Sequence, residues 1–337
     1  MTYIKGIGMT KFDVDQRSSY ERVYECVNDA LDSGNIGIEN IDVIFVSNAE
    51  AESNGERQKH IGPMMSSMFQ KKMPIVTVPA GCGGGGTALW NAIHYQKNNK
   101  ENNILVIGFE KLVANLSERA TDEMLMGGER VYEQNEGVIF PAQNALVAQQ
   151  YMMKYNATED DLALVALKNH DNAFLNPKAR FTDIEIAGSG LSTSNLASFE
   201  REDMTSWDST VTAGKIAYKE AGIKPKDIDI AEVHDAFTPV ELISYEDLGF
   251  TGKGKGKDLI REGYTNLSGK LPVNTSGGLK AKGHPISATG VSQIYELVLQ
   301  LRGQAGKRQV DNVKICLAHN IGGAGSTASV HILKKVV

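Results

Sequence analysis

Short apolar runs rich in β-branched residues recur along the chain and predict buried strands. Four of them read DVIFVS (42–47), NILVIG (103–108), IDIAEV (228–233) and VKICL (313–317). A fifth, STASVHIL (326–333), alternates between apolar and polar residues, which favours an edge strand or a half-covered face. Segments with helical periodicity lie between the strands, at 20–33, 87–97 and 291–301. Strands that alternate with helices predict α/β layers around a largely parallel sheet.

The chain also resembles itself. The segment ALDSGNIGIENIDVIFVSNA (30–49) aligns without gaps with AYKEAGIKPKDIDIAEVHDA (217–236), and each copy reads as a helix, a turn and a buried strand. After each copy, a glycine-containing turn, a helix and another strand follow in the same order. We therefore predict two pseudo-equivalent α/β halves, 1–181 and 182–337, with an inserted loop region at about 112–175 in the first half.

The duplication has a chemical consequence. The turn of the first half carries Gly81 and Cys82, and the corresponding turn of the second half carries Gly283 and His284. In a pseudo-twofold arrangement, corresponding turns can converge on one site. A nucleophile from one half would then face a base from the other.

Cys82 stands in the sequence VPAGCGGGGTAL (78–89), where a short apolar strand leads into a predicted helix. A thiol at a helix N-terminus lies near the positive end of the helix dipole, which favours the nucleophilic thiolate. Glycines there let backbone groups approach closely. Because four glycines at the start of a helix destabilise it, we expect them to have a functional reason. The alternative is a small buried cysteine in a tight turn.

Three histidines lie at turns or strand ends that suit a catalytic site. His284 stands between glycine and proline, so it cannot lie inside a helix, and it can take and return the proton of a thiol. His234 follows a predicted strand and can donate a hydrogen bond to a thioester oxygen. The run CLAHNIGGAG (316–325) ends another strand, and either His319 or Asn320 could face the reacting carbon. A single site needs a nucleophile, a base and oxyanion donors, and these positions supply them together.

Composition narrows the class of protein. The net charge of −6 and the pI of about 5.7 leave no basic field for nucleic acid. Three cysteines without a CxxC pair argue against a disulfide framework and against a structural zinc site, and we expect reduced thiols in the cytoplasm. The N-terminus lacks the long apolar region expected of a signal peptide, and no apolar stretch is long enough to span a membrane.

At these motifs the sequence resembles the thiolase superfamily. The resemblance is closest to the branch of archaeal acetyl-CoA acetyltransferases and sterol-carrier-protein-type thiolases. It rests on Cys82 in its glycine turn, HDAF (234–237), NTSGGLKAKGHP (274–285) and HNIGG (319–323), and it covers nearly the whole chain. It implies a duplicated thiolase fold with five αβαβα layers, assembly as dimers or tetramers, and CoA thioester substrates.

The resemblance also implies roles. Cys82 would accept the acyl group, His284 would deprotonate it, and His234 would help to form an oxyanion hole. Main-chain N–H groups near Cys82 would form a second oxyanion hole with the glycines of the last motif. The substrate-binding positions that the resemblance implies are Asn320, Gly322, Gly323, Gly283 and Ser276.

Two departures from the family pattern stand out. Ordinary thiolases have a second cysteine in a CxG motif as the base for the α-proton, whereas this chain has His319 and Asn320 there, so the second base is expected to be His319 or else His284. The family also has several tens of residues after the position of Phe181, with a strand carrying a DGA motif that opens the second half. Here either the second half lacks its first strand or the sequence is incomplete.

The predicted activity is that of an acetyl-CoA C-acetyltransferase, with no metal and no redox cofactor. Alternatives are a thiolase for longer 3-ketoacyl-CoA, a related retro-aldolase, and a non-catalytic scaffold or lipid-binding subunit. The presence of Cys82 argues against the aldolase, which has no use for an acyl-cysteine. The resemblance also implies a complex with hydroxymethylglutaryl-CoA synthase and a small zinc-ribbon/OB-fold protein.

Overall fold

The computed structural model describes residues 2–12, 17–49, 58–98, 102–111, 121–122, 124–173, 184–197 and 200–335. In the first half the elements are β1 (Tyr3–Ile4), α1 (Ser19–Gly34), β2 (Val43–Ser47), α2 (Ile61–Phe69), β3 (Ile75–Thr77), α3 (Gly84–Asn98) and β4 (Ile104–Gly108). Two helices follow, α5 (Phe140–Tyr155) and α6 (Glu159–Ala173). The second half contains β5 (Ile184–Thr193), α7 (Asp208–Ala221), β6 (Ile230–Glu232), α8 (Thr238–Asp247), α9 (Gly256–Arg261), α10 (Thr289–Arg302), β7 (Ile315–Gly322) and β8 (Thr327–Lys335).

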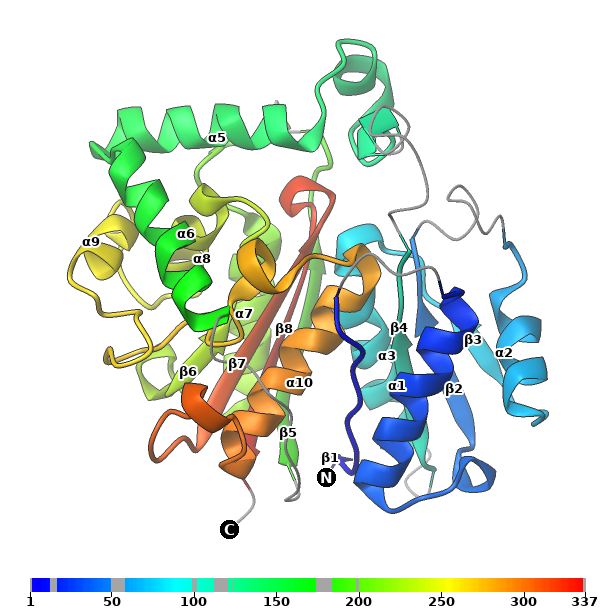
Figure 1. Cartoon of the computed structure of the whole chain (residues 1–337). Coiled ribbons are helices and arrows are strands. Elements are labelled where there is room, and N and C mark those ends of the chain that lie inside the picture. Colours follow the sequence, from blue (N-terminus) through cyan, green and yellow to red (C-terminus); the bar gives the residue numbers. More distant parts are fainter. Residues whose placement is uncertain are drawn as a thin grey trace.

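These elements form the five expected layers (Figure 1). A three-stranded sheet has the order β3-β2-β4, and a five-stranded sheet has the order β1-β5-β8-β7-β6. Helices α3 and α10 pack against each other between the two sheets. Helix α1 covers the outer face of the first sheet, and α7 covers the outer face of the second. The central layer therefore contains one helix from each half.

Local sequence explains where the outer helix of the first half forms. Ser18 accepts a hydrogen bond from the Glu21 N–H, and the Glu21 side chain accepts one from the Ser18 N–H, so the helix begins with a capping box. Val23, Val27 and Leu31 then recur every four residues and are buried against the first sheet. The predicted helix at 20–33 is thus confirmed.

The two sheets differ in strand direction. All pairs in the first sheet are parallel, as predicted, but β8 runs antiparallel to both β5 and β7. The prediction that 326–333 lies at an edge is wrong, because β8 is an inner strand and is buried along most of its length. His331 meets polar partners inside the protein: its Nδ1 lies 3.1 Å from Ser189 Oγ and its Nε2 lies 3.2 Å from the Gly86 carbonyl. The polar positions of the alternation are therefore buried and do not face solvent.

The sheet of the second half is complete, contrary to one of the two expectations for the missing segment. Strand β5 opens that half and pairs with β8. In the first half, by contrast, no described strand lies between β4 and the N-terminal segment, where β8 has its place in the second half. Phe181 lies outside the described residues. Within the described ranges, no helix has both the length and the apolar character needed to cross a bilayer.

Candidate active site

Cys82 lies at the junction of the two halves. It occupies a single 3₁₀ turn, Gly81–Gly83, which follows β3 and leads directly into α3. The thiol is half-buried, and Gly81 has a φ of +48°, a left-handed conformation that favours glycine. All three cysteines lie among the described residues, and none forms a disulfide.

The glycine run after Cys82 serves helix packing. A Cβ on Gly85 would lie 2.8 Å from the Ser287 carbonyl oxygen, just before α10. A Cβ on Gly86 would lie 1.9 Å from the Ser329 hydroxyl on β8. Any larger residue would push α3 away from the second half. The run therefore brings the Cys82 turn close to the second half.

The His284 ring is held in place by a hydrogen bond at one of its two nitrogens. Gly283, with a φ of +115°, turns the chain, and the His284 Nδ1 lies 2.6 Å from the Thr289 hydroxyl. That hydroxyl donates its own hydrogen to the Pro285 carbonyl at 3.2 Å, so it accepts from His284. The proton of neutral His284 is thus on Nδ1, and Nε2 carries a lone pair that can act as a base.

His234 has the opposite tautomer. Its Nδ1 lies 3.2 Å from the Asn320 Nδ2, which donates to it. The amide orientation of Asn320 follows from its other contact, because its Oδ1 accepts a hydrogen bond of 3.4 Å from the Gly86 N–H. Neutral His234 therefore carries its proton on Nε2 and can donate it. The two imidazole rings meet edge to face, with centroids 5.1 Å apart and planes at 88°.

Both imidazoles are neutral at pH 7. Burial, together with the positive charge of Lys282, lowers the pKa of His284 to about 4. Burial, together with the neighbouring His284 and His319, lowers the pKa of His234 well below its ordinary value. One ring is therefore set to accept a proton and the other to donate a hydrogen bond.

Cys82, His234 and His284 line one cavity of about 240 Å³. The prediction that Cys82 and His284 share a cleft is confirmed, and Gly322 and Gly323 also lie on its walls. The remaining walls are largely apolar and include Met124, Phe140, Pro141, Trp207, Phe237 and Ile286. Sequence reasoning missed most of these, because Met124, Phe140 and Trp207 come from segments without a motif. Phe237 and Ile286 could have been found, since each is within three residues of a catalytic candidate.

The structure does not bring His319 to this cavity. Its Nε2 lies 2.9 Å from the Thr210 hydroxyl of α7, on the outer side of the second sheet, and the side chain is completely buried. Burial lowers its pKa to about 3. Because neighbouring residues of a strand point to opposite faces, Asn320 faces the central layer and His319 faces away. The expectation of a base at position 319 has no support in this geometry.

Two other expected binding residues lie behind the cavity and not on its walls. The Ser276 hydroxyl donates to the Glu232 carboxylate at 2.6 Å, and the Ser276 N–H donates to the same group at 3.0 Å. Gly283 borders a separate hollow beside Phe12. Both residues therefore support the turn that carries His284.

Among the described residues, no three His, Cys, Asp or Glu side chains are grouped so as to hold a metal ion.

Comparison with known proteins identifies the family. The model of the thiolase N-terminal domain matches residues 6–228, and that of the thiolase C-terminal domain-like family matches residues 190–335. The chain belongs to the thiolase family. The five-layered fold and the glycine-rich Cys82 turn of this thiolase-family protein agree with that membership.

Proteins that are similar to this chain have names that refer to different activities. The acetyl-CoA acetyltransferase of Methanothermobacter thermautotrophicus is 32% identical over 379 residues, which cover 98% of each chain. Sterol carrier protein 2 of Bos taurus is 28% identical over 387 residues, which cover 96% of this chain and 70% of that protein. The solved structure called Ltp2-ChsH2(DUF35) aldolase superposes with a TM-score of 0.80 at 22% identity, covering 98% of this chain and 97% of that chain. The alignments with the acetyl-CoA acetyltransferase and with sterol carrier protein 2 are longer than the 337 residues of this chain. These two relatives therefore contain segments that this chain lacks.

Proposed function

We propose that this thiolase-family protein is an acetyl-CoA C-acetyltransferase, which interconverts two acetyl-CoA with acetoacetyl-CoA and CoA. The observation that carries the proposal is the shared cavity of Cys82, His234 and His284, with complementary histidine tautomers. The cavity of about 240 Å³ suits a short acyl group. The relative of highest identity given above has the same name as this activity.

The first half-reaction acylates the cysteine. His284 Nε2 takes the proton of the Cys82 thiol, and the sulfur forms a bond with the carbonyl carbon of acetyl-CoA. The Nε2–H of His234 donates to the oxygen that becomes negative. The carbon–sulfur bond to CoA then breaks, and His284 returns the proton to the CoA thiolate.

The second half-reaction forms the carbon–carbon bond. His284, neutral again, takes a proton from the methyl group of a second acetyl-CoA. The resulting carbanion attacks the carbonyl of acetyl-Cys82, and the bond to the cysteine sulfur breaks. His284 then gives its proton to Cys82. In this scheme one base serves both half-reactions, which removes the need for a base at position 319.

Thiolysis of acetoacetyl-CoA tests the proposal. We expect turnover with acetoacetyl-CoA to exceed turnover with 3-ketoacyl-CoA of eight or more carbons, and we expect Cys82→Ser to lose about 10⁴-fold or more. Cys316→Ser is the matched control, because Cys316 is buried in β7 away from the cavity. If longer substrates react faster, a degradative thiolase replaces the proposal. If acetyl-CoA does not block the labelling of Cys82 by iodoacetamide, a non-catalytic subunit does.

We further propose that the protein works in the cytoplasm as a homodimer or tetramer. A complex with hydroxymethylglutaryl-CoA synthase and a zinc-ribbon/OB-fold protein is part of the same proposal. The name of the solved structure Ltp2-ChsH2(DUF35) aldolase joins two proteins, which makes a protein partner worth testing here. Co-purification with tagged protein and light scattering of the purified chain are the direct measurements.

A further inference from the structure

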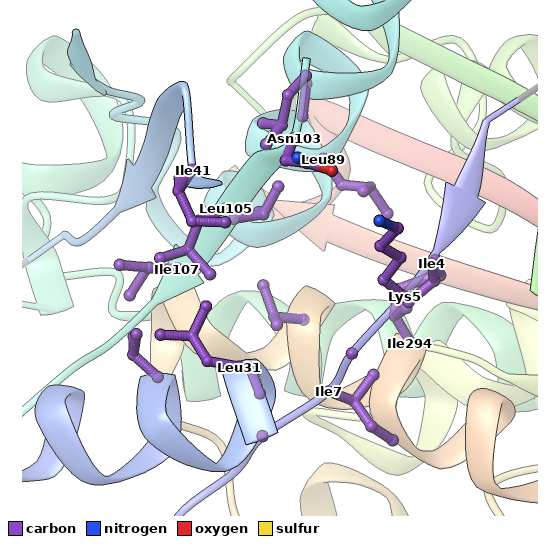
Figure 2. Close-up of a pocket in the computed structure, with 18 of the residues that line it drawn as sticks. Ile4, Lys5, Ile7, Leu31, Ile41, Leu89, Asn103, Leu105, Ile107 and Ile294 are labelled. Carbon is purple, nitrogen blue, oxygen red and sulfur yellow. The ribbon is translucent and has the colours of Figure 1, made fainter. Parts of the chain in front are cut away.

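A mainly apolar cavity lies away from Cys82, in the first half of the protein. It has a volume of about 460 Å³ and lies between β4 and the N-terminal segment 2–8. Figure 2 shows Leu105 and Ile107 across an open space from Ile4, Lys5 and Ile7. We call this space the β4 slot.

The second half has a strand at the corresponding place. There β8 lies between β7 and β5 and pairs with both along its length. Strand β5 in turn packs closely on α7: a Cβ on Gly188 would lie 2.3 Å from the Ala217 carbonyl, and one on Gly190 would lie 2.0 Å from the Ala213 carbonyl.

The N-terminal segment repeats this packing on α1. A Cβ on Gly6 would lie 2.0 Å from the Ala30 carbonyl, and one on Gly8 would lie 1.9 Å from the Cys26 carbonyl. The internal alignment matches Ala30 with Ala217, and the same offset continued four residues towards the N-terminus pairs Cys26 with Ala213. The segment 2–8 is therefore the counterpart of β5, β4 is the counterpart of β7, and the β4 slot is the place of a counterpart to β8.

Both sides of the slot present sheet edges. Within the described part of the chain, β4 is an edge strand that pairs only with β2, and β1 is an edge strand that pairs only with β5. Edge strands have backbone N–H and C=O groups that can pair with an added strand. The other walls are apolar on both faces, with Leu31 of α1 on one and Leu89 and Ile294 of the central helices on the other. A strand in the slot would therefore be apolar at alternate positions on both sides.

We propose that the β4 slot binds an extended, apolar segment of a separate polypeptide, antiparallel to β4, and so completes the first sheet. Every strand in the described part of the chain already has its place in one of the two sheets. The connection from Ala173 to Ile184 is about as long as the nine residues of β8, and it also has to join α6 to β5. The relatives, whose alignments run over 379 and 387 residues, have additional chain that this protein lacks.

A labelled peptide tests the proposal with the full-length protein. The peptide has the nine-residue sequence of β8, with alanine in place of the polar Ser329 and His331, because the walls of the slot are mainly apolar. We expect saturable binding by fluorescence anisotropy, and slower amide hydrogen exchange at 104–108 by about tenfold or more. A second peptide with proline at the position of Val330 should bind at least about tenfold more weakly, because proline cannot donate to a neighbouring strand.

Two variants connect the binding to the slot. Leu89→Trp fills the space and should weaken binding by about tenfold or more, whereas Leu146→Trp, on the exposed side of α5, should leave it unchanged. Binding that ignores both the proline and Leu89→Trp would overturn the proposal. So would a slot that takes a fatty acid such as lauric acid but not the peptide. Protection of 104–108 that grows with protein concentration alone would assign the slot to a second copy, and would also overturn it.

Discussion

Asn320 decides which nitrogen of His234 carries the proton. Its amide is oriented by the Gly86 N–H and donates to His234 Nδ1. We predict that Asn320→Asp lowers single-turnover acylation by acetyl-CoA by about 10²-fold, because a carboxylate can only accept, and His234 then turns its proton inward. Rapid-quench measurement of acetyl-Cys82 checks this. Acylation at the wild-type rate would show that His234 does not need this tautomer.

His319, one residue earlier, has a structural role that depends on pH. Its pKa is lowered to about 3 from an ordinary value of 6.5, so the folded state excludes a proton that the unfolded chain binds. The stability from neutral His319 is complete above pH 6.5 and declines as the pH falls towards 3, by about 1.4 kcal/mol per pH unit.

The variant His319→Gln lacks this titration. Its stability deficit relative to wild type should therefore be largest at pH 7 and should shrink by about 1.4 kcal/mol between pH 6 and pH 5. Urea unfolding at these pH values measures it, with Thr210→Val as a variant that retains the imidazole but loses its hydrogen bond. A deficit independent of pH would contradict the burial of a neutral ring.

The sequence alone could not distinguish Asn320 from His319. Both follow the same strand, and alternation along a strand says only that they face opposite ways. The choice depends on which face of β7 meets α3 and α10, and that is a property of the assembled layers. Cys82 and His284 were predictable because glycine and proline fix their turns locally.

Among the elements, α3 and α10 control the distance between Cys82 and His284. Their contact depends on the absence of a side chain at Gly85, where a Cβ would lie 2.8 Å from the Ser287 backbone oxygen. We predict that Gly85→Ala destabilises the protein by about 1–3 kcal/mol, although alanine is the better helix former. Gly252→Ala, where a Cβ meets nothing within 4 Å, is the matched control.

Chemical denaturation and steady-state thiolysis should change together in Gly85→Ala. The helix shift that relieves the clash also separates the Cys82 turn from the second half, so we expect turnover to fall by about tenfold or more. A variant that is as stable and active as wild type would mean that the central layer adapts without cost.

The strands that could be predicted from the sequence were apolar strands that are buried on both faces. The apolar runs at 42–47 and 103–108 predicted parallel strands correctly, because both faces of β2 and β4 meet apolar layers. Strand β8 misled the sequence reading because Ser329 and His331 are polar and yet buried. The hydrogen-bond partners of His331 come from β5 and α3, far away in the sequence, and Ser329 packs against Gly86 of α3.

At the scale of the whole molecule, the central layer contains one helix from each half, so we expect the two halves to unfold as one unit. The two tryptophans report on them separately: Trp90 lies in α3, and Trp207 is buried beside α7. We predict that Trp90→Phe and Trp207→Phe, each monitored by the remaining tryptophan, give coincident urea transitions. Two separated midpoints would show that the halves unfold independently.

The duplication was visible in the sequence and predicted the convergence of Cys82 with His284, whereas the five layers were implied by the resemblance to the thiolase superfamily. The position of the missing strand was not visible, because the comparison with the family placed the gap next to the second half. Only the glycine packing of 2–8 on α1 assigns the gap to the first sheet.

The walls of the catalytic cavity divide into a part that can vary and a part that cannot. Cys82 and His284 lie on turns whose positions are set by backbone contacts between the halves. A substitution in these turns would therefore destabilise the core. Met124 and Phe140 belong to the region between β4 and α6, outside the central layer, are only partly buried, and line the same cavity. A protein built this way can acquire a new substrate range by exchanging its peripheral wall while Cys82 and His284 stay fixed, so laboratory evolution towards longer acyl chains should accumulate its changes at 124 and 140.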